Sequence, residues 1–97
     1  MGFKIIFSPE SLEHLGEMVR HIAQDNPDAA LRVGMKLLDH AALLADFPEL
    51  GRPYAKRPGI RRLSVKPYAI CYRVRSEIRV IEILEFWHGA RRGPVLL

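Results

Sequence analysis

The sequence predicts one α+β domain with the element order βααβββ, in which a twisted antiparallel sheet carries an antiparallel helical hairpin packed on one face. Three features of the sequence predict it. A short β-rich run opens the chain, two long amphipathic stripes at helical spacing follow, and runs of β-branched and aromatic residues close it. Because 97 residues suffice for one hydrophobic core, residues 1–97 are predicted to form a single domain.

The opening residues predict a strand followed by a helix. The run FKIIF, residues 3–7, is short and β-rich, and Ser8 after it can cap a helix whose first turn begins with Pro9. Apolar residues then recur at helical spacing, so this stripe must face something within the fold. The stripe consists of Leu12, Leu15, Val19, Ile22 and Ala23.

A second helix is predicted from the same pattern of a capping residue followed by proline, with Asn26 as the cap and Pro27 in the first turn. The short connection between two long helices predicts an antiparallel hairpin. Gly34 inside the second helix indicates close packing, because glycine there costs roughly 1 kcal/mol relative to alanine. The apolar stripe of this helix is Ala30, Val33, Leu37, Leu38, Ala41, Leu44 and Ala45, and Phe47-Pro48 ends it.

A basic loop and a three-stranded meander are predicted for the second half. Residues 48–59 hold three Pro and two Gly, as is typical of a loop. The runs IRRLSV, YAICYRV and IRVIEILEFW follow, separated by Lys66-Pro67 and Ser76-Glu77, which are short enough for antiparallel hairpins. The last run is apolar at both parities, as expected for a strand covered on both sides, and a bound partner could supply one cover.

Charge and composition indicate the class of protein. A net charge of +4 favours an acidic partner. From Gly51 onward eleven Lys or Arg stand against three acids, whereas residues 1–50 carry four against eight, so the second half is expected to dock a polyanion or an acidic protein. No uncharged apolar run is long enough to span a membrane and no signal peptide is apparent, which predicts a cytoplasmic protein without a membrane partner.

Cysteine and histidine usage bears on cofactors. Cys71 is alone, so it is predicted to be a small buried hydrophobe rather than a reactive thiol. His14, His21, His40 and His88 lack metal-binding spacing, and no Gly-rich nucleotide loop is present. We therefore expect neither a metal nor another cofactor.

Several segments, in this order and spacing, resemble the RelE/ParE superfamily of bacterial type II toxins, most closely its ParE-type branch. They are Asn26-Pro27-Asp28-Ala29-Ala30, Phe47-Pro48-Glu49-Leu50-Gly51, Arg61-x-Leu63, Pro67-Tyr68 with Tyr72-Arg73, and His88-Gly89-Ala90-Arg91. The resemblance implies a toxin encoded beside an acidic antitoxin, whose flexible C-terminal segment wraps and neutralises it in a hetero-oligomer. ParE-like members poison DNA gyrase, whereas RelE-like members cut mRNA in the ribosomal A site without a metal.

Three functions therefore stay open: a gyrase poison first, a ribosome-dependent mRNA endonuclease second, and a non-catalytic nucleic-acid-binding module third. Cleavage of RNA through its 2′-hydroxyl needs a base, an acid and cations. The candidates for these roles are Arg61, Arg73, His88 and Arg91. A second convincing acid or base is missing, since Glu82 and Glu85 are expected to pair with neighbouring arginines.

Two binding surfaces are predicted. His88, Arg91 and Arg92 at the end of the last strand are the candidate target-binding residues, although for His88 a structural role at the sheet edge is equally open. Arg61 shares strand parity with Leu63, which predicts a partly inward side chain with an acidic partner. The antitoxin is expected on an exposed apolar and basic face formed by Arg61, Arg73, Ile81, Ile83 and Trp87.

Overall fold

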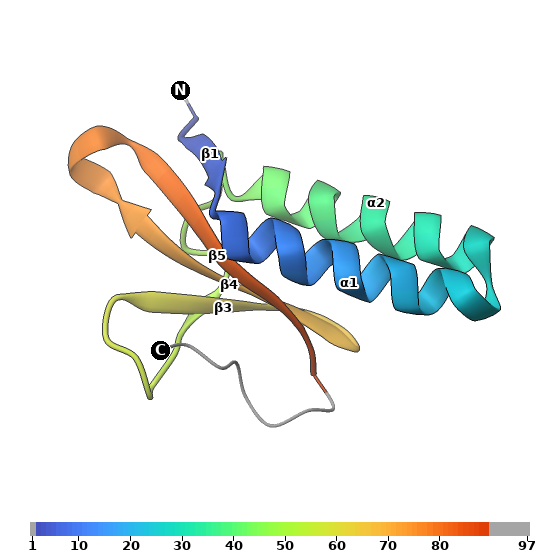
Figure 1. Cartoon of the computed structure of the whole chain (residues 1–97). Helices are drawn as coiled ribbons and strands as arrows, with labels where there is room; N and C mark the ends of the chain where they lie inside the picture. The colour runs from blue at the N-terminus through green and yellow to red at the C-terminus, as the bar shows by residue number, and fades with distance from the viewer. Residues whose placement is uncertain (1, 90–97) are drawn as a thin grey trace.

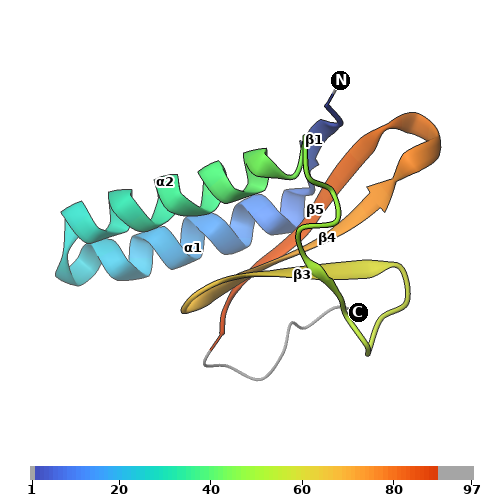
Figure 2. The ribbon, with the colours of Figure 1, turned by 180° about the vertical axis from the view of Figure 1, so that it is seen from behind.

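The computed structural model describes residues 2–89, which form the predicted succession of helices and strands (Figure 1). Seen from both sides, the two helices lie side by side and form a separate layer against the sheet (Figure 2). The elements are β1 (Lys4–Phe7), α1 (Pro9–Asp25), α2 (Pro27–Leu43), β2 (Arg52–Pro53), β3 (Ile60–Val65), β4 (Tyr68–Arg75), the 3-10 helix η1 (Ser76–Ile78) and β5 (Val80–His88).

Both helices begin at the predicted caps. The Ser8 hydroxyl accepts a hydrogen bond from the Ser11 N–H, and the Asn26 side chain accepts one from the Ala29 N–H, each at 3.0 Å. Asn26 is the only residue between α1 and α2, so the chain has to reverse there and form the predicted hairpin. Neither helix of residues 2–89 is long and apolar enough to cross a membrane.

The sheet is mixed, whereas an antiparallel sheet was predicted. Its strand order is β1-β5-β4-β3-β2, and β3, β4 and β5 form the expected antiparallel meander. β1, however, lies parallel to β5, with Ile5 opposite Ile81. Parallel neighbours need a crossover connection, and the helical hairpin with the meander supplies it. β2 is an addition within the predicted loop, where Arg52 lies opposite Arg62.

The connection between β4 and β5 is longer than the predicted Ser76-Glu77 turn. η1 takes in Ile78, and Arg79 adopts a left-handed conformation with φ 53° and ψ 50°. β5 therefore begins at Val80, and Ile78 projects from the turn with 64% of its surface exposed.

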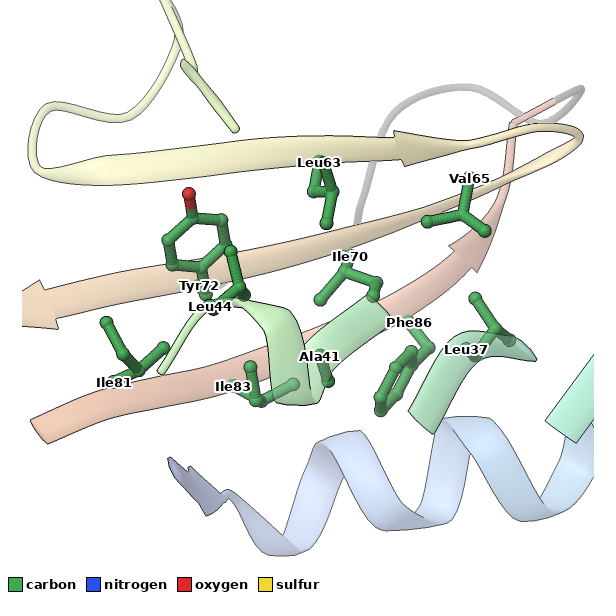
Figure 3. Close-up of a cluster of buried hydrophobic side chains, with 10 residues drawn as sticks. All are labelled: Leu37, Ala41, Leu44, Leu63, Val65, Ile70, Tyr72, Ile81, Ile83 and Phe86. Atoms are coloured by element: carbon green, nitrogen blue, oxygen red, sulfur yellow. The ribbon is translucent and has the colours of Figure 1, made fainter. Parts of the chain in front are cut away.

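The main core lies between α2 and one face of the sheet (Figure 3). Leu15 and Met18 of α1 are only partly buried at its margin, and Leu12 is exposed, so the predicted stripe of α1 is only partly inward. The fully or nearly fully buried residues of this core are Leu37, Ala41, Leu44, Leu63, Val65, Ile70, Tyr72, Ile81, Ile83 and Phe86.

Tyr72 fixes the loop that leads from the helices to the sheet. The Gly51 N–H donates to the Tyr72 hydroxyl, which donates to the Pro48 carbonyl, both at 2.8 Å. Arg61 Nη1 donates to the Gly51 carbonyl at 2.7 Å, so the partner of Arg61 is a backbone carbonyl and not the predicted acid. A Cβ on Gly51 would lie 2.8 Å from the Tyr72 side chain and 2.9 Å from the Arg62 carbonyl oxygen, which requires glycine at this position.

We expect Tyr72→Phe to lower the free energy of unfolding by about 1–3 kcal/mol, because it removes a donor and leaves the buried Gly51 N–H without its acceptor. Urea unfolding followed by circular dichroism measures the change. Tyr54→Phe is the matched control, since no hydrogen bond joins the Tyr54 hydroxyl to another residue of the described chain. Equal unfolding midpoints for the two variants would contradict the role assigned to Tyr72.

A second, smaller cluster lies on the other face of the sheet and contains Cys71. Ile60, Ala69, Cys71 and Trp87 are buried together there, which confirms the prediction of a buried cysteine. Burial, with a smaller contribution from the nearby Glu85, raises the pKa of the Cys71 thiol to about 12, although Arg62 opposes the shift. The native thiol is therefore a poor nucleophile.

We predict that Cys71 resists labelling by a thiol reagent at pH 8 and reacts at once in urea. Because its pKa rises from an ordinary 9.0 to about 12, the native state keeps a proton that the unfolded state loses within that range. Stability should therefore fall as the pH rises above 9 toward 12, and less steeply in Cys71→Ala, since the contribution of the thiol is then removed and that of the raised pKa of Tyr72 stays. Fast labelling of the folded protein would show that the thiol is accessible.

Candidate functional site

Charged side chains gather on the face of the sheet that points away from the helices, which we call the open face. Side chains alternate along a strand, so the neighbours of the inward-facing Leu63, Tyr72 and Ile81 project to this side. The open face carries Arg62 and Ser64 of β3, Ala69, Cys71, Arg73 and Arg75 of β4, and Glu82 and Trp87 of β5.

An arginine pair brackets one carboxylate on the open face. Glu82 Oε1 lies 3.9 Å from Arg73 Nη1 and 3.3 Å from Arg75 Nε, so Glu82 has the structural role that was predicted for it. All three side chains are about a third or more exposed, and ion pairs at such positions contribute at most about 1 kcal/mol. Two cations against one anion leave this part of the surface positive.

Trp87 is covered by side chains of its own chain. The Arg62 guanidinium lies over its ring, 4.8 Å from the centroid, and the Tyr54 ring meets it edge-on at 6.4 Å. The indole is buried as a result. A bound partner was expected to cover this side of β5, but Tyr54 and Arg62 of the same chain cover Trp87 there.

Glu85 is a buried carboxylate beside α1. The β4–β5 ladder shifts register so that Cys71 pairs with Glu85 and Tyr72 with Ile83, which leaves Leu84 in a bulge. Glu85 is 5% exposed, and its Oε1 lies 3.9 Å from Nδ1 of His14. His14 of α1 is thus one neighbour of Glu85, and the pairing of Glu85 with an arginine stays a prediction.

The five residues predicted to bind the antitoxin do not form one surface. Ile81 and Ile83 are fully buried beneath the helices, and Arg61 is bound to the loop through Gly51. Only Arg73 and Trp87 belong to the open face, and Trp87 is buried there. The predicted exposed apolar face is therefore wrong, because a strand that is apolar at both parities does not reveal which parity the helices cover.

The candidates for RNA cleavage do not converge either. His88 lies opposite Tyr68 in the β4–β5 ladder, and the two rings meet edge-on at 5.1 Å. Arg73 is five residues farther along β4 than Tyr68, which corresponds to about 16 Å. Within residues 2–89, no three metal-ligating side chains lie close enough together to hold an ion. Arg91 and Arg92 lie outside the described residues.

The outer side of α2 carries an apolar stripe that was not predicted, and it includes Leu38, which was wrongly assigned to the inward stripe of this helix. Leu31, Met35 and Leu38 follow the spacing i, i+4, i+7 and are 67%, 53% and 38% exposed. We call these three residues the α2 stripe. The exposed Arg32 and Lys36 flank it. The sequence feature that could have predicted this exposed stripe is a second series of apolar residues at helical spacing, beside the buried series. A helix that is apolar on two sides can bury only one of them in a two-layer fold.

Comparisons with known proteins identify a family and a similar protein for this chain. The family described as "ParE toxin of type II toxin-antitoxin system, parDE" matches residues 5–93. A Sinorhizobium fredii protein named "Putative toxin Y4kP" is 33% identical over 96 residues, which cover 97% of this chain and 96% of that protein.

Two solved structures share the fold. A chromosomal ParDE toxin–antitoxin system from P. aeruginosa contains a chain that superposes with a TM-score of 0.76 at 21% identity, covering 89% of this chain and 95% of that one. The toxin–antitoxin complex RelBE2 from Mycobacterium tuberculosis gives a TM-score of 0.72 at 20% identity, with coverages of 91% and 99%. The family match over nearly the whole length identifies this chain as a member of the ParE family of toxins from type II toxin–antitoxin systems.

Proposed function

We propose that this toxin arrests growth by acting on DNA gyrase, without chemistry of its own, and that a co-encoded acidic antitoxin neutralises it. The observation that carries the proposal is the match of the ParE family over residues 5–93. Two observations support it: Arg73 lies far from His88 along β4, and Arg61 is bound to the Gly51 carbonyl, whereas acid–base catalysis needs its groups within hydrogen-bonding reach of one substrate.

A protein-directed inhibitor acts through surface shape and charge. The second half of the chain holds an excess of eight positive charges, eleven Lys or Arg minus three acids from Gly51 onward. Positive charge favours rapid association with an acidic protein surface or with the DNA that gyrase holds. Action on gyrase also implies a place in the cytoplasm.

Ribosome-dependent cleavage of mRNA is the second candidate. His88 supports it, because its imidazole is only partly buried at the end of β5, where it could exchange a proton with a bound molecule. The two candidates therefore make opposite predictions for this residue.

We expect His88→Gln to keep most of the toxicity, since glutamine preserves much of the polar surface and no proton transfer is required. Induction without antitoxin should produce filamentation and an SOS response, and the purified variant should still inhibit gyrase supercoiling. A ribonuclease would lose about 10²- to 10⁴-fold in rate on removal of a positioned acid or base. A folded, antitoxin-binding but inert His88→Gln protein, together with messages cleaved by the parent, would overturn the gyrase proposal.

We further propose that the antitoxin docks an amphipathic segment on the α2 stripe. Leu31 and Met35 are apolar side chains left exposed, and such side chains on one helix face fit a partner helix or an extended segment. Arg32 and Lys36 beside the stripe complement an acidic partner. The open face around Arg73 offers charge with few exposed apolar anchors, so it is the alternative docking surface.

Leu31→Glu should weaken antitoxin binding by about 30-fold or more, the effect of losing a central apolar anchor worth about 2 kcal/mol. Ile78→Glu is the matched control: Ile78 is 64% exposed against 67% for Leu31, but it lies on the β4–β5 turn. Calorimetry with the purified antitoxin measures both affinities. Unchanged binding of Leu31→Glu combined with a large loss for Arg73→Glu would place the antitoxin on the open face.

A further inference from the structure

A hollow of about 300 Å³ lies at the turn of the β3–β4 hairpin. Lys66 and Pro67 form the turn, and the Gly89 N–H donates to the Pro67 carbonyl, which ties the end of β5 to it. A Cβ on Gly89 would lie 2.6 Å from that carbonyl oxygen, so glycine allows this close approach. The described residues that line the hollow are Arg62, Ser64, Lys66, Pro67, Tyr68 and Gly89.

The described lining of the hollow is positive. Arg62 and Lys66 contribute two cations, Ser64 contributes a hydroxyl, and none of the lining residues is acidic. The ion pairs found among residues 2–89 involve His14, Arg73 and Arg75, and neither Arg62 nor Lys66 takes part in one. Within residues 2–89, no carboxylate is therefore ion-paired with either cation of the hollow; Glu85, on the same cross-strand row as Arg62, is separated from it by Cys71.

Arg62 is held in place but lacks hydrogen-bond acceptors. Its guanidinium is stacked on the Trp87 ring, which restricts the orientation of the guanidinium plane. Arg62 Nε and Trp87 Nε1 are both buried, and neither has a hydrogen-bond partner in the described chain. Buried donors without acceptors are rare in folded proteins, and each calls for an explanation. Nε itself is closed to solvent, but Arg62 lines the hollow, where an anion rich in acceptor oxygens would bind the N–H groups of its guanidinium that remain accessible.

We propose that this hollow binds a nucleoside phosphate, with the phosphate held by Arg62, Lys66 and the Ser64 hydroxyl. Arginine binds phosphate through its planar fork and lysine as a point charge. The volume, at the lower end of the range for small-ligand pockets, is too large for a bare phosphate, so the ribose or base has space beside Pro67 and Tyr68. The nucleotide is either free or part of a single strand, since a duplex presents its phosphates on a convex surface. This site is independent of whether gyrase is the target.

Fluorescence anisotropy of a fluorescein-labelled ten-nucleotide uridine strand, titrated with the full-length protein in 100 mM salt, tests the proposal. Lys66→Glu and Ser64→Asp both change exposed residues and should each weaken binding by about tenfold or more, because the first removes a charged contact to phosphate and the second places a carboxylate beside the phosphate. Lys4→Glu makes the same charge change at an exposed position on β1, opposite Val80 and so at the other end of β5 from Gly89, where screening over about 10 Å should leave the affinity unaltered. Circular dichroism and antitoxin binding verify the folding of each variant.

The single tryptophan gives a local readout, because Trp87 lies directly beneath Arg62. Titration with unlabelled uridine monophosphate should change its emission in the parent and much less in Lys66→Glu. Competition by the mononucleotide would identify a free nucleotide as sufficient, whereas binding of the strand alone would identify a single strand as the ligand. The proposal fails if neither binds, or if the strand binds Lys66→Glu and Ser64→Asp as tightly as the parent. It also fails if duplex DNA competes as well as the single strand.

Discussion

The hydrogen bonds of the Tyr72 hydroxyl are the constraint on which the rest of this structure depends. The ring of Tyr72 is part of the core beside Leu44, the residue that follows α2 (Figure 3), and its hydroxyl holds both Pro48 and Gly51. One side chain of β4 thereby holds the loop that follows α2 at two points. Arg61 adds a third bond to the same loop through the Gly51 carbonyl. These contacts tie the segment that leaves the helical layer to β3 and β4 of the sheet.

The arginines of the described chain differ in whether another group of the fold already uses their charge. Arg61 is used inside the fold, and Arg73 and Arg75 share Glu82 on the open face. Arg62 differs from them, because an aromatic ring and not a carboxylate fixes its position. A cation held in this way keeps its hydrogen-bonding capacity for a ligand, which is why the β3–β4 turn stands out among the basic regions of the described chain.

The two proposed binding surfaces lie on different layers of the molecule. The α2 stripe belongs to the outer side of the helical layer, whereas the hollow opens at the end of the β3–β4 hairpin. Variants of one surface therefore share no residue with variants of the other. Apolar anchors suit a protein partner that is bound tightly, and uncompensated cations suit a phosphate whose binding depends on salt.

The sequence alone determined the elements and their local signals. Ser8 and Asn26 cap the helices as predicted, Lys66-Pro67 makes the first hairpin turn, and Cys71 is buried in a strand, because each of these features depends on residues only a few positions apart. The family also could be inferred, since its segments are read in order along the chain. Only the tertiary structure decided which side each element shows.

The direction of β1 depends on a crossover through almost the whole chain, which no local pattern encodes. The burial of Ile81 and Ile83 depends on which face of β5 the helices cover, and two apolar parities gave no preference between them. Arg61 donates to the Gly51 carbonyl because the loop folds back over β3. Leu31 is exposed because α2 packs against the sheet through its opposite side. Each of these features depends on contacts between residues distant in the sequence. A site built from several strands could therefore be identified only from the tertiary structure.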